Sequence, residues 1–432
     1  MTGGYISVII PIKQIVLITN ENFRRAKMLF DLANDKVKQH ILQAEFGLER
    51  ESLRVTVDGT LAQTKHPFPG HRNIDRDFCE NQIEIIGDVF NEPEPMNAQL
   101  NRLQDEIDSQ LIKDGEVLWA FSNPPKISGE DEIPVAEFGG SQRGKSEYRN
   151  YLAAKYGKKK MLFSGIHLNF SFAEPLLRAS FEQSGEQDFQ EYKNDLYLKL
   201  ARRLTQYAWL VVYLTAASPV LDESFGVESG KYSSVRCSEL GYWNTFTPIL
   251  DYTDLRRYIV SIARYIDSGD LKAASELYYP VRVKPRGANS LDALLEKGVN
   301  HLELRVLDVN PYSRTGIFTE DIKFVHLLLL YLASLPDLVF DKAAQEQAIA
   351  DVKSAAVFGN EEIERRAESV LKQIAEYTAR SLPEFRPVIE YQQAKLREGN
   401  SYAERILKSF GNGYAEKALA LAKGYQRGEG DV

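Results

Sequence analysis

Two carboxylates stand two residues apart in an otherwise apolar stretch of the chain. Glu49 and Glu51 lie in residues 47–55 (GLERESLRV), a run that reads as a buried strand. Alternate side chains of a strand point to the same face, so both carboxylates would share one face. Like charges held side by side repel and lose hydration unless a cation lies between them, which indicates a divalent metal site. The alternative is an exposed edge strand whose charges face water.

Two later stretches, residues 164–172 and 301–310, alternate almost regularly between polar and apolar residues. This period of two predicts strands with one face on a core and one polar face. The residues on the polar faces are of types that bind metals or anions, so we expect a concave sheet lined for a ligand. These residues are His167, Asn169 and Ser171 in the first stretch, and His301, Glu303 and Arg305 in the second.

Two further carboxylates, Asp77 and Glu84, lie in the acidic segment 75–84. The candidate metal ligands are therefore mostly hard oxygen donors with one imidazole, a set that suits magnesium or manganese better than a structural zinc. Each of these residues also has a simpler interpretation that involves no metal. Asp77 and Glu84 could share the solvated face of a helix, and His167 could be a core histidine with satisfied hydrogen bonds. The candidate set is Glu49, Glu51, Asp77, Glu84, His167 and Glu303.

Several cations could hold an anionic group near these carboxylates. Arg305 shares its predicted strand with Glu303, and Arg236 lies in the polar segment 233–244. Arginine suits bidentate capture of a carboxylate or a phosphate. A third group of cations consists of Arg282, Lys284 and Arg286, for which surface ion pairing is the alternative.

Residues 139–146 (GGSQRGKS) match the P-loop pattern G-x-x-x-x-G-K-[ST] in full. A P-loop needs a buried strand directly before it and an apolar run ending in Asp to hold magnesium. The preceding residues 130–138 are acidic and contain Pro134, which makes them a poor central strand, and no convincing downstream run is present. We therefore expect a flexible glycine-rich loop that closes over a ligand.

The bulk composition limits the classes of protein to consider. A chain of 432 residues, 44% hydrophobic and 26% charged, is typical of a soluble globular protein. Its net charge of -8 argues against a nucleic-acid partner. Only two cysteines, Cys79 and Cys237, indicate a reducing, cytoplasmic location. Residues 5–19 lack the basic start of a signal peptide, and residues 324–340 are too short to span a membrane.

The remaining periodicity predicts an α+β protein with a large helical share. Apolar residues recur at spacings of three and four in several segments, and from Phe318 onward the chain is almost continuously helical. We expect a catalytic core over residues 1–330, with its motifs in 45–310, and a helical C-terminal layer over 331–432, forming one compact unit. The other predicted helices cover residues 20–43, 96–111, 145–156 and 188–216.

Six motifs, taken in order, resemble those of the bacterial glutamate–cysteine ligases, also called gamma-glutamylcysteine synthetases. The resemblance covers about residues 40 to 330 and extends both to stand-alone enzymes and to the ligase half of bifunctional glutathione-synthesising enzymes. The motifs are residues 47–55, Asp77-Phe78 with Glu84, residues 164–171, residues 236–244, Glu276-Leu277-Tyr278 with Pro280, and residues 303–311.

The resemblance implies a glutamine-synthetase-like fold. In that fold a curved, mainly antiparallel sheet forms a funnel for ATP, magnesium and glutamate, with helices outside. It implies that the six candidate ligands bind magnesium, with manganese as the alternative metal, and that ATP is a co-substrate. Arg305 would face the transferred phosphoryl group, and Arg236 would hold glutamate. The resemblance further places Phe78, Phe138, Tyr242 and Tyr278 near the cysteine pocket, and we expect Asn169 and Lys145 in the nucleotide site.

The implied reaction is the first step of glutathione biosynthesis. ATP would phosphorylate the gamma-carboxylate of glutamate, and the amine of cysteine would then displace phosphate to give gamma-glutamylcysteine. No ATP-grasp half follows in this sequence, so we expect a separate glutathione synthetase to act downstream.

Two departures from the family's pattern leave the acceptor amine open. Phe138 stands where a tyrosine is usual, and Trp243 stands where a smaller residue is common. The alternatives are a glutamate ligase for another amine and, in a different class, a metal-dependent amide hydrolase that uses the same carboxylates and histidine without ATP.

Overall fold

A computed structural model of the protein describes residues 29–397 and 399–432. Within these residues, a seven-stranded sheet has the order β2-β3-β1-β5-β7-β6, and β4 pairs with the end of β1. All of these pairs are antiparallel, as predicted for the sheet. The strands are β1 (Ala44–Thr56), β2 (Ile74–Arg76), β3 (Gln82–Ile86), β4 (Glu116–Leu118), β5 (Gly165–Phe172), β6 (Val281–Lys284) and β7 (His301–Asp308).

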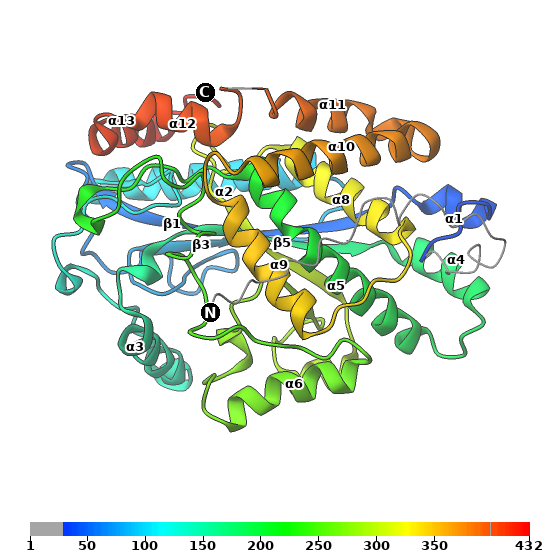
Figure 1. The fold of residues 1–432 in the computed structure, drawn as a ribbon. Helices are drawn as coiled ribbons and strands as arrows, with labels where there is room; N and C mark the ends of the chain where they lie inside the picture. Colours follow the sequence, from blue (N-terminus) through cyan, green and yellow to red (C-terminus); the bar gives the residue numbers. More distant parts are fainter. Residues whose placement is uncertain (1–28, 398) are drawn as a thin grey trace, which may run out of the picture.

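Helices surround the sheet (Figure 1). Helix α5 packs on β6 and β7, α2 packs on β1 and β4, and α8 packs against both helices. The C-terminal helices α10 to α13 lie along the upper side of Figure 1, and α3 and α6 lie below the sheet. The helices are α1 (Asp35–His40), α2 (Pro93–Asp114), α3 (Arg143–Tyr156), α4 (Glu174–Ser184), α5 (Phe189–Thr215), α6 (Leu255–Asp267), α7 (Leu291–Lys297), α8 (Thr319–Ser334), α9 (Lys342–Ala355), α10 (Glu361–Ser381), α11 (Arg386–Ala394), α12 (Tyr402–Phe410) and α13 (Tyr414–Gln426).

The alternating strands have the two faces that their sequences predicted. The apolar residues of β5 and β7 are buried in the main core, together with Phe46 and Leu48 of β1. Burying this face against helices fixes the register, because a slip of one residue would exchange the two faces. The apolar residues of β5 and β7 in this core are Ile166, Leu168, Phe170, Phe172, Leu302, Leu304, Val306 and Leu307.

Three of the predicted helices are confirmed within the described residues, as α2, α3 and α5. Helix α2 starts with Pro93 in its first turn and ends at Gly115, whose φ of 69° supplies the left-handed cap. In its buried stripe lie the residues that predicted it, Met96, Leu100, Leu103, Ile107 and Leu111.

The helix predicted over residues 20–43 is wrong for part of its length. Residues 20–28 lie outside the described residues, and residues 29–34 form bends and turns before the short helix α1. The side chain of Asn34 accepts hydrogen bonds from the backbone N–H groups of Lys36 and Val37 and so caps α1 at Asp35. Such local polar bonds compete with helix continuation. The apolar stretch at residues 5–19 also lies outside the described residues.

Residues 139–146 do not form a P-loop, as expected from the sequence. No strand directly precedes them in the described structure, and they form a single 3₁₀ turn followed by the start of α3. The acidic segment 75–84 is likewise not a helix, because it forms β2, a turn and β3. Asp77 and Glu84 therefore do not share a helix face.

Helix α8 contains most of the apolar segment 324–340, which was predicted to be too short to span a membrane. Twelve of its 16 residues are buried. Across the described part of the chain, no helix combines the length and apolar character needed to cross a membrane.

His326 of α8 is a buried histidine in this core. Its ring contacts the rings of Phe46, Phe170, Phe172 and Phe385 at centroid distances of 5.2–6.1 Å. Its Nε2 atom has no hydrogen-bond partner among the described residues. Burial lowers the pKa of His326 from 6.5 to about 3. The neutral ring is therefore stable in the fold, whereas the unfolded chain takes up a proton below pH 6.5.

We predict that the His326→Leu variant loses less stability on acidification than the wild type. Between about pH 7 and about pH 5, the wild type should lose up to about 2 kcal/mol through this residue, because each pH unit below its unfolded pKa costs ~1.4 kcal/mol. Urea denaturation at both pH values measures the difference, with His40→Gln as the control. Equal pH dependence in wild type and His326→Leu would contradict the prediction.

Candidate active site

The polar face of the sheet lines a cavity of about 260 Å³. Its walls include all six predicted metal ligands, both predicted catalytic arginines and three of the four residues predicted near the acceptor. The structure therefore brings together side chains that are up to 256 positions apart in the sequence (49 to 305). These lining residues are Glu49, Glu51, Asp77, Glu84, His167, Glu303, Arg236, Arg305, Phe78, Tyr242 and Tyr278.

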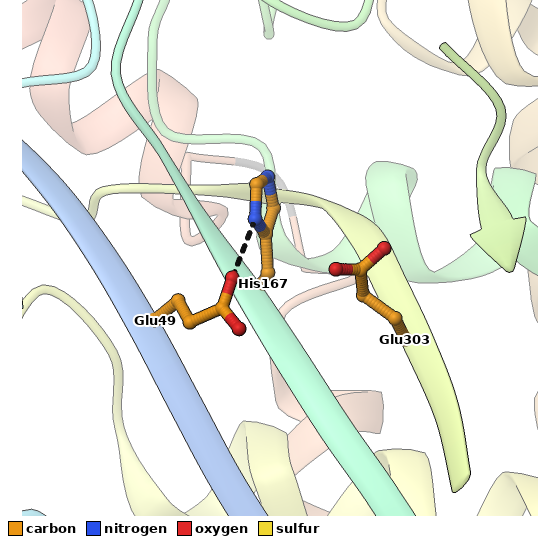
Figure 2. A group of neighbouring side chains, drawn as sticks. All are labelled: Glu49, His167 and Glu303. Atoms are coloured by element: carbon orange, nitrogen blue, oxygen red, sulfur yellow. Dashed lines mark hydrogen bonds and ion pairs between the residues drawn. The ribbon is translucent and has the colours of Figure 1, made fainter. Parts of the chain in front are cut away.

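Strand register positions these side chains. Glu49 of β1 lies opposite His167 of β5, and Glu51 lies opposite Glu84 of β3. Residues directly opposite each other on one face of an antiparallel pair have neighbouring side chains. Figure 2 shows Glu49, His167 and Glu303 directed toward one another from three strands, β1, β5 and β7.

Glu49, His167 and Glu303 form the first of two groups of ligand types. Their ligand atoms lie within 4.8 Å of one another, and His167 Nδ1 is 3.3 Å from Glu49 Oε2. Burial and the nearby charge of Arg305 lower the pKa of His167 to about 4. A neutral imidazole beside two carboxylates has the lone pair that metal binding requires.

Three cations surround the carboxylate of Glu303. Arg282 Nε lies 2.6 Å from it, Lys284 Nζ 3.2 Å and Arg305 Nη1 3.3 Å. Burial alone would raise the pKa of Glu303, but these cations hold it well below its usual value. One carboxylate cannot neutralise three cations, so this side of the cavity carries positive charge for an anionic ligand.

Glu51, Asp77 and Glu84 form the second group, in which burial and mutual repulsion disfavour the ionised carboxylates. Burial and the charge of Asp77 raise the pKa of Glu51 to about 8, although Gly165 N–H donates to it over 2.9 Å. Burial and the neighbouring carboxylates likewise raise the pKa of Glu84 well above its usual value. Burial also raises the pKa of Asp77, despite Arg149 and Arg305 nearby. Holding ionised carboxylates together in a buried site costs free energy. A divalent cation bound between them would lower that cost, so this group suits a metal site.

Arg236 has unused hydrogen-bonding capacity in the cavity. Its Nη1 donates to the backbone oxygen of Arg305 over 2.8 Å, while its buried Nε has no partner among the described residues. The guanidinium packs against Gly165, where an added Cβ would lie only 2.1 Å from Arg236 Cζ. Glycine at this position therefore makes room for an arginine that can bind a carboxylate.

Three predicted site residues are not among the residues that line the cavity. Phe138 is outside the cavity lining, with its ring 4.1 Å from the guanidinium carbon of Arg76. Lys145 also lies outside the lining, and its ammonium is 3.8 Å from Asp75 Oδ2. Asn169 is on the polar face beyond the lining and donates to Glu49 Oε1 over 3.1 Å.

The lining also contains residues that the sequence analysis did not assign to the site. Tyr148, Arg149 and Leu152 come from α3, and the spacing of Tyr148 and Leu152 marks one face of that predicted helix. Arg282 and Lys284 lie in the lining, while Arg286 of the same cationic group is exposed.

Carboxylates are ligands that divalent cations prefer and arginines bind anions, so a sheet that gathers both on one face is suited to a metal ion together with an anionic ligand. The model of one family, described as glutamate-cysteine ligase, matches residues 29–272 and 263–354, and the chain belongs to this family.

Curated relatives are similar over most of this chain. The glutathione biosynthesis bifunctional protein GshAB of Clostridium perfringens is 33% identical over 432 residues, which cover 91% of this chain and 55% of that protein. GshAB of Enterococcus faecalis is 36% identical over 352 residues, covering 79% and 45%. The chain thus spans about half the length of the curated relatives it matches.

Solved structures share the fold. A bifunctional glutathione synthetase from Pasteurella multocida aligns with a TM-score of 0.80 at 28% identity, over 93% of this chain and 55% of that one. A glutamate–cysteine ligase from Francisella tularensis, solved in complex with AMP, aligns with a TM-score of 0.79 at 24% identity, over 90% and 89%. These alignments confirm the glutamine-synthetase-like architecture.

The second carboxylate group predicts opposite effects of one substitution in the absence and presence of metal. Glu84→Gln should raise the stability of the metal-free protein by about 1 kcal/mol, because it removes a charge that burial disfavours. The same variant should lose much of the increase in melting temperature caused by magnesium. Thermal unfolding with and without magnesium measures both effects, with the exposed Glu92→Gln as the control. A magnesium effect that is unchanged in Glu84→Gln would contradict the assignment.

Proposed function

We propose that this protein joins the gamma-carboxylate of glutamate to the amine of cysteine with ATP, through a gamma-glutamyl phosphate. The observation that carries the proposal is that one cavity contains a cluster of carboxylates together with Arg236 and Arg305. Carboxylates are poor electrophiles, so their activation is the difficult part of amide formation. Membership of the glutamate–cysteine ligase family supports the reaction.

Different side chains of the cavity would bind the substrate and stabilise charge during the reaction. Arg305, 3.4 Å from His167 and 3.3 Å from Glu303, would stabilise charge on the transferring phosphoryl group. Arg236, which lines the cavity, would hold a carboxylate of glutamate through its guanidinium group. Magnesium held by the two carboxylate groups would, when bound, neutralise the phosphates and the substrate carboxylate, which otherwise repel each other.

The acceptor is proposed to be cysteine, bound beside the aromatic wall formed by Phe78, Tyr242 and Tyr278. Of the two departures from the family's pattern, Trp243 lines the cavity and Phe138 does not. Acceptor choice should therefore depend on Trp243. A screen of phosphate release with cysteine, alanine and 2-aminobutyrate identifies the preferred amine. A glutathione synthetase activity is the proposed consumer of the product.

We predict that ADP release requires glutamate, an amine acceptor and magnesium together. Arg305→Ala should lower kcat at least about a hundredfold, because it removes a buried charge aimed at the transferred group. The exposed Arg286→Ala, on the loop after β6, should leave turnover unchanged. A coupled ADP assay measures both variants, and circular dichroism checks their folding. Full activity in Arg305→Ala would contradict this assignment, and amide hydrolysis without nucleotide would support a hydrolase instead.

A further inference from the structure

A wholly buried carboxylate, that of Glu276, lies behind the aromatic wall of the cavity. Glu276 ends a 3₁₀ turn (Ala274–Glu276), has 0% exposed surface and is absent from the cavity lining. The nearby residues Tyr278, Tyr279 and Pro280 all line the cavity. A buried charge is costly unless it is paired, so its partners indicate what it holds in place.

Helix α3 supplies most of these partners. Glu276 Oε1 accepts hydrogen bonds from Lys155 Nζ over 2.6 Å and from Tyr156 hydroxyl over 2.7 Å. Its Oε2 accepts from the backbone N–H of Lys272 over 2.6 Å. Burial alone would lower the pKa of Lys155, but its bond to Glu276 raises that pKa above the usual value. Lys155 is therefore protonated, and its bond to Glu276 ties the C-terminal end of α3 to the segment that leads to Tyr278.

Asn244 connects a third segment to the same point. Its Nδ2 donates to the backbone oxygen of Glu276 over 2.8 Å, and its Oδ1 accepts from the backbone N–H of Tyr278 over 3.0 Å. Asn244 directly follows Tyr242 and Trp243, both of which line the cavity. Three separate pieces of the cavity wall, from α3, residues 242–244 and residues 275–280, thus meet at Glu276.

The rings of the wall are also in contact. The ring of Tyr278 lies 5.5 Å from that of Tyr156 and 5.5 Å from that of Tyr242, both edge to face. Tyr156 therefore touches Glu276 through its hydroxyl and Tyr278 through its ring. A shift of α3 would therefore also move the ring of Tyr278, since packed rings leave little free space.

From these contacts we propose that Glu276 is a positioning residue that fixes the aromatic wall against which the acceptor amine binds. The inference rests on the proposed function. Glu276 lies outside the lining and acts through Tyr278 and α3. Its removal should loosen the acceptor side of the cavity and leave unchanged the carboxylates that stand on strands of the sheet, Glu49, Glu51, Glu84 and Glu303.

The described chain contains a matched control for this pair. Asp321 is 2% exposed, lies 2.5 Å from Lys395 Nζ, and accepts from Tyr402 hydroxyl over 2.9 Å. Both sites are therefore buried carboxylates that bind a lysine and a tyrosine; Glu276 also accepts from Tyr151 hydroxyl over 3.4 Å, and Asp321 accepts from Gln392 Nε2 over 2.9 Å. Asp321 joins α8, α11 and the start of α12, and neither it nor its partners line the cavity.

The test compares steady-state kinetics of Glu276→Gln and Asp321→Asn with the wild type, using cysteine as the amine. For Glu276→Gln we expect the KM for cysteine to rise at least about tenfold, because a charged buried bond network is lost, while the KM values for glutamate and ATP change less than about twofold. Asp321→Asn should lower the melting temperature and leave all three KM values unchanged.

Other outcomes separate the possible failures. An unchanged KM for cysteine in Glu276→Gln, or an equal rise in all three KM values, would overturn the positioning role. If Glu276→Gln does not fold, Tyr156→Phe removes the hydroxyl's bonds to Glu276 and Asn244 and keeps the ring contact with Tyr278. A selective rise in the KM for cysteine in this variant would then support the positioning role, and its absence would overturn it. A wild type that forms no gamma-glutamyl amide with any amine would overturn the proposed function and, with it, this inference.

Discussion

The crowding of carboxylates on one face of an antiparallel sheet is the constraint on which the rest of the structure depends. Glu49 and Glu51 share a face because a strand has a period of two, and the register places His167 and Glu84 opposite them. A slip of one residue would turn these charges toward the helices. The apolar residues packed on α2 and α5 therefore secure the site from the other face of the sheet.

Charge is distributed unevenly along this polar face, and the difference gives its two parts different tasks. Around Glu303, three cations share one carboxylate, so that part suits the phosphates of a nucleotide. Around Glu51 and Glu84, burial and the neighbouring carboxylates raise the pKa values, so a divalent cation would stabilise the ionised forms. Phosphoryl transfer to a carboxylate needs both parts side by side, because its reactants are all anions.

Strictly periodic segments were the part of the fold that the sequence predicted best. The alternation around His167 and Glu303 predicted the polar faces of β5 and β7, and these residues reach the cavity lining. Phe138, predicted near the acceptor, does not line the cavity and contacts the lining residue Arg149; it follows an irregular segment whose path no periodic pattern specifies. The hydrogen bonds of the Asn34 side chain, which make α1 begin at Asp35, could also not be predicted from the spacing of apolar residues. Glu276 was seen as part of a motif, but its role as a junction depends on contacts with α3 and Asn244 that only the three-dimensional structure contains.

The central claim is that the substrate carboxylate is activated by phosphorylation in this cavity. Glutamate carrying ¹⁸O in its gamma-carboxylate tests this most directly, when it is turned over with ATP, magnesium and an amine and the released phosphate is examined by mass spectrometry. Displacement of phosphate from a gamma-glutamyl phosphate leaves one of the labelled oxygens on phosphorus. We expect label in the released phosphate in step with amide formation. Amide formation accompanied by unlabelled phosphate would contradict the mechanism.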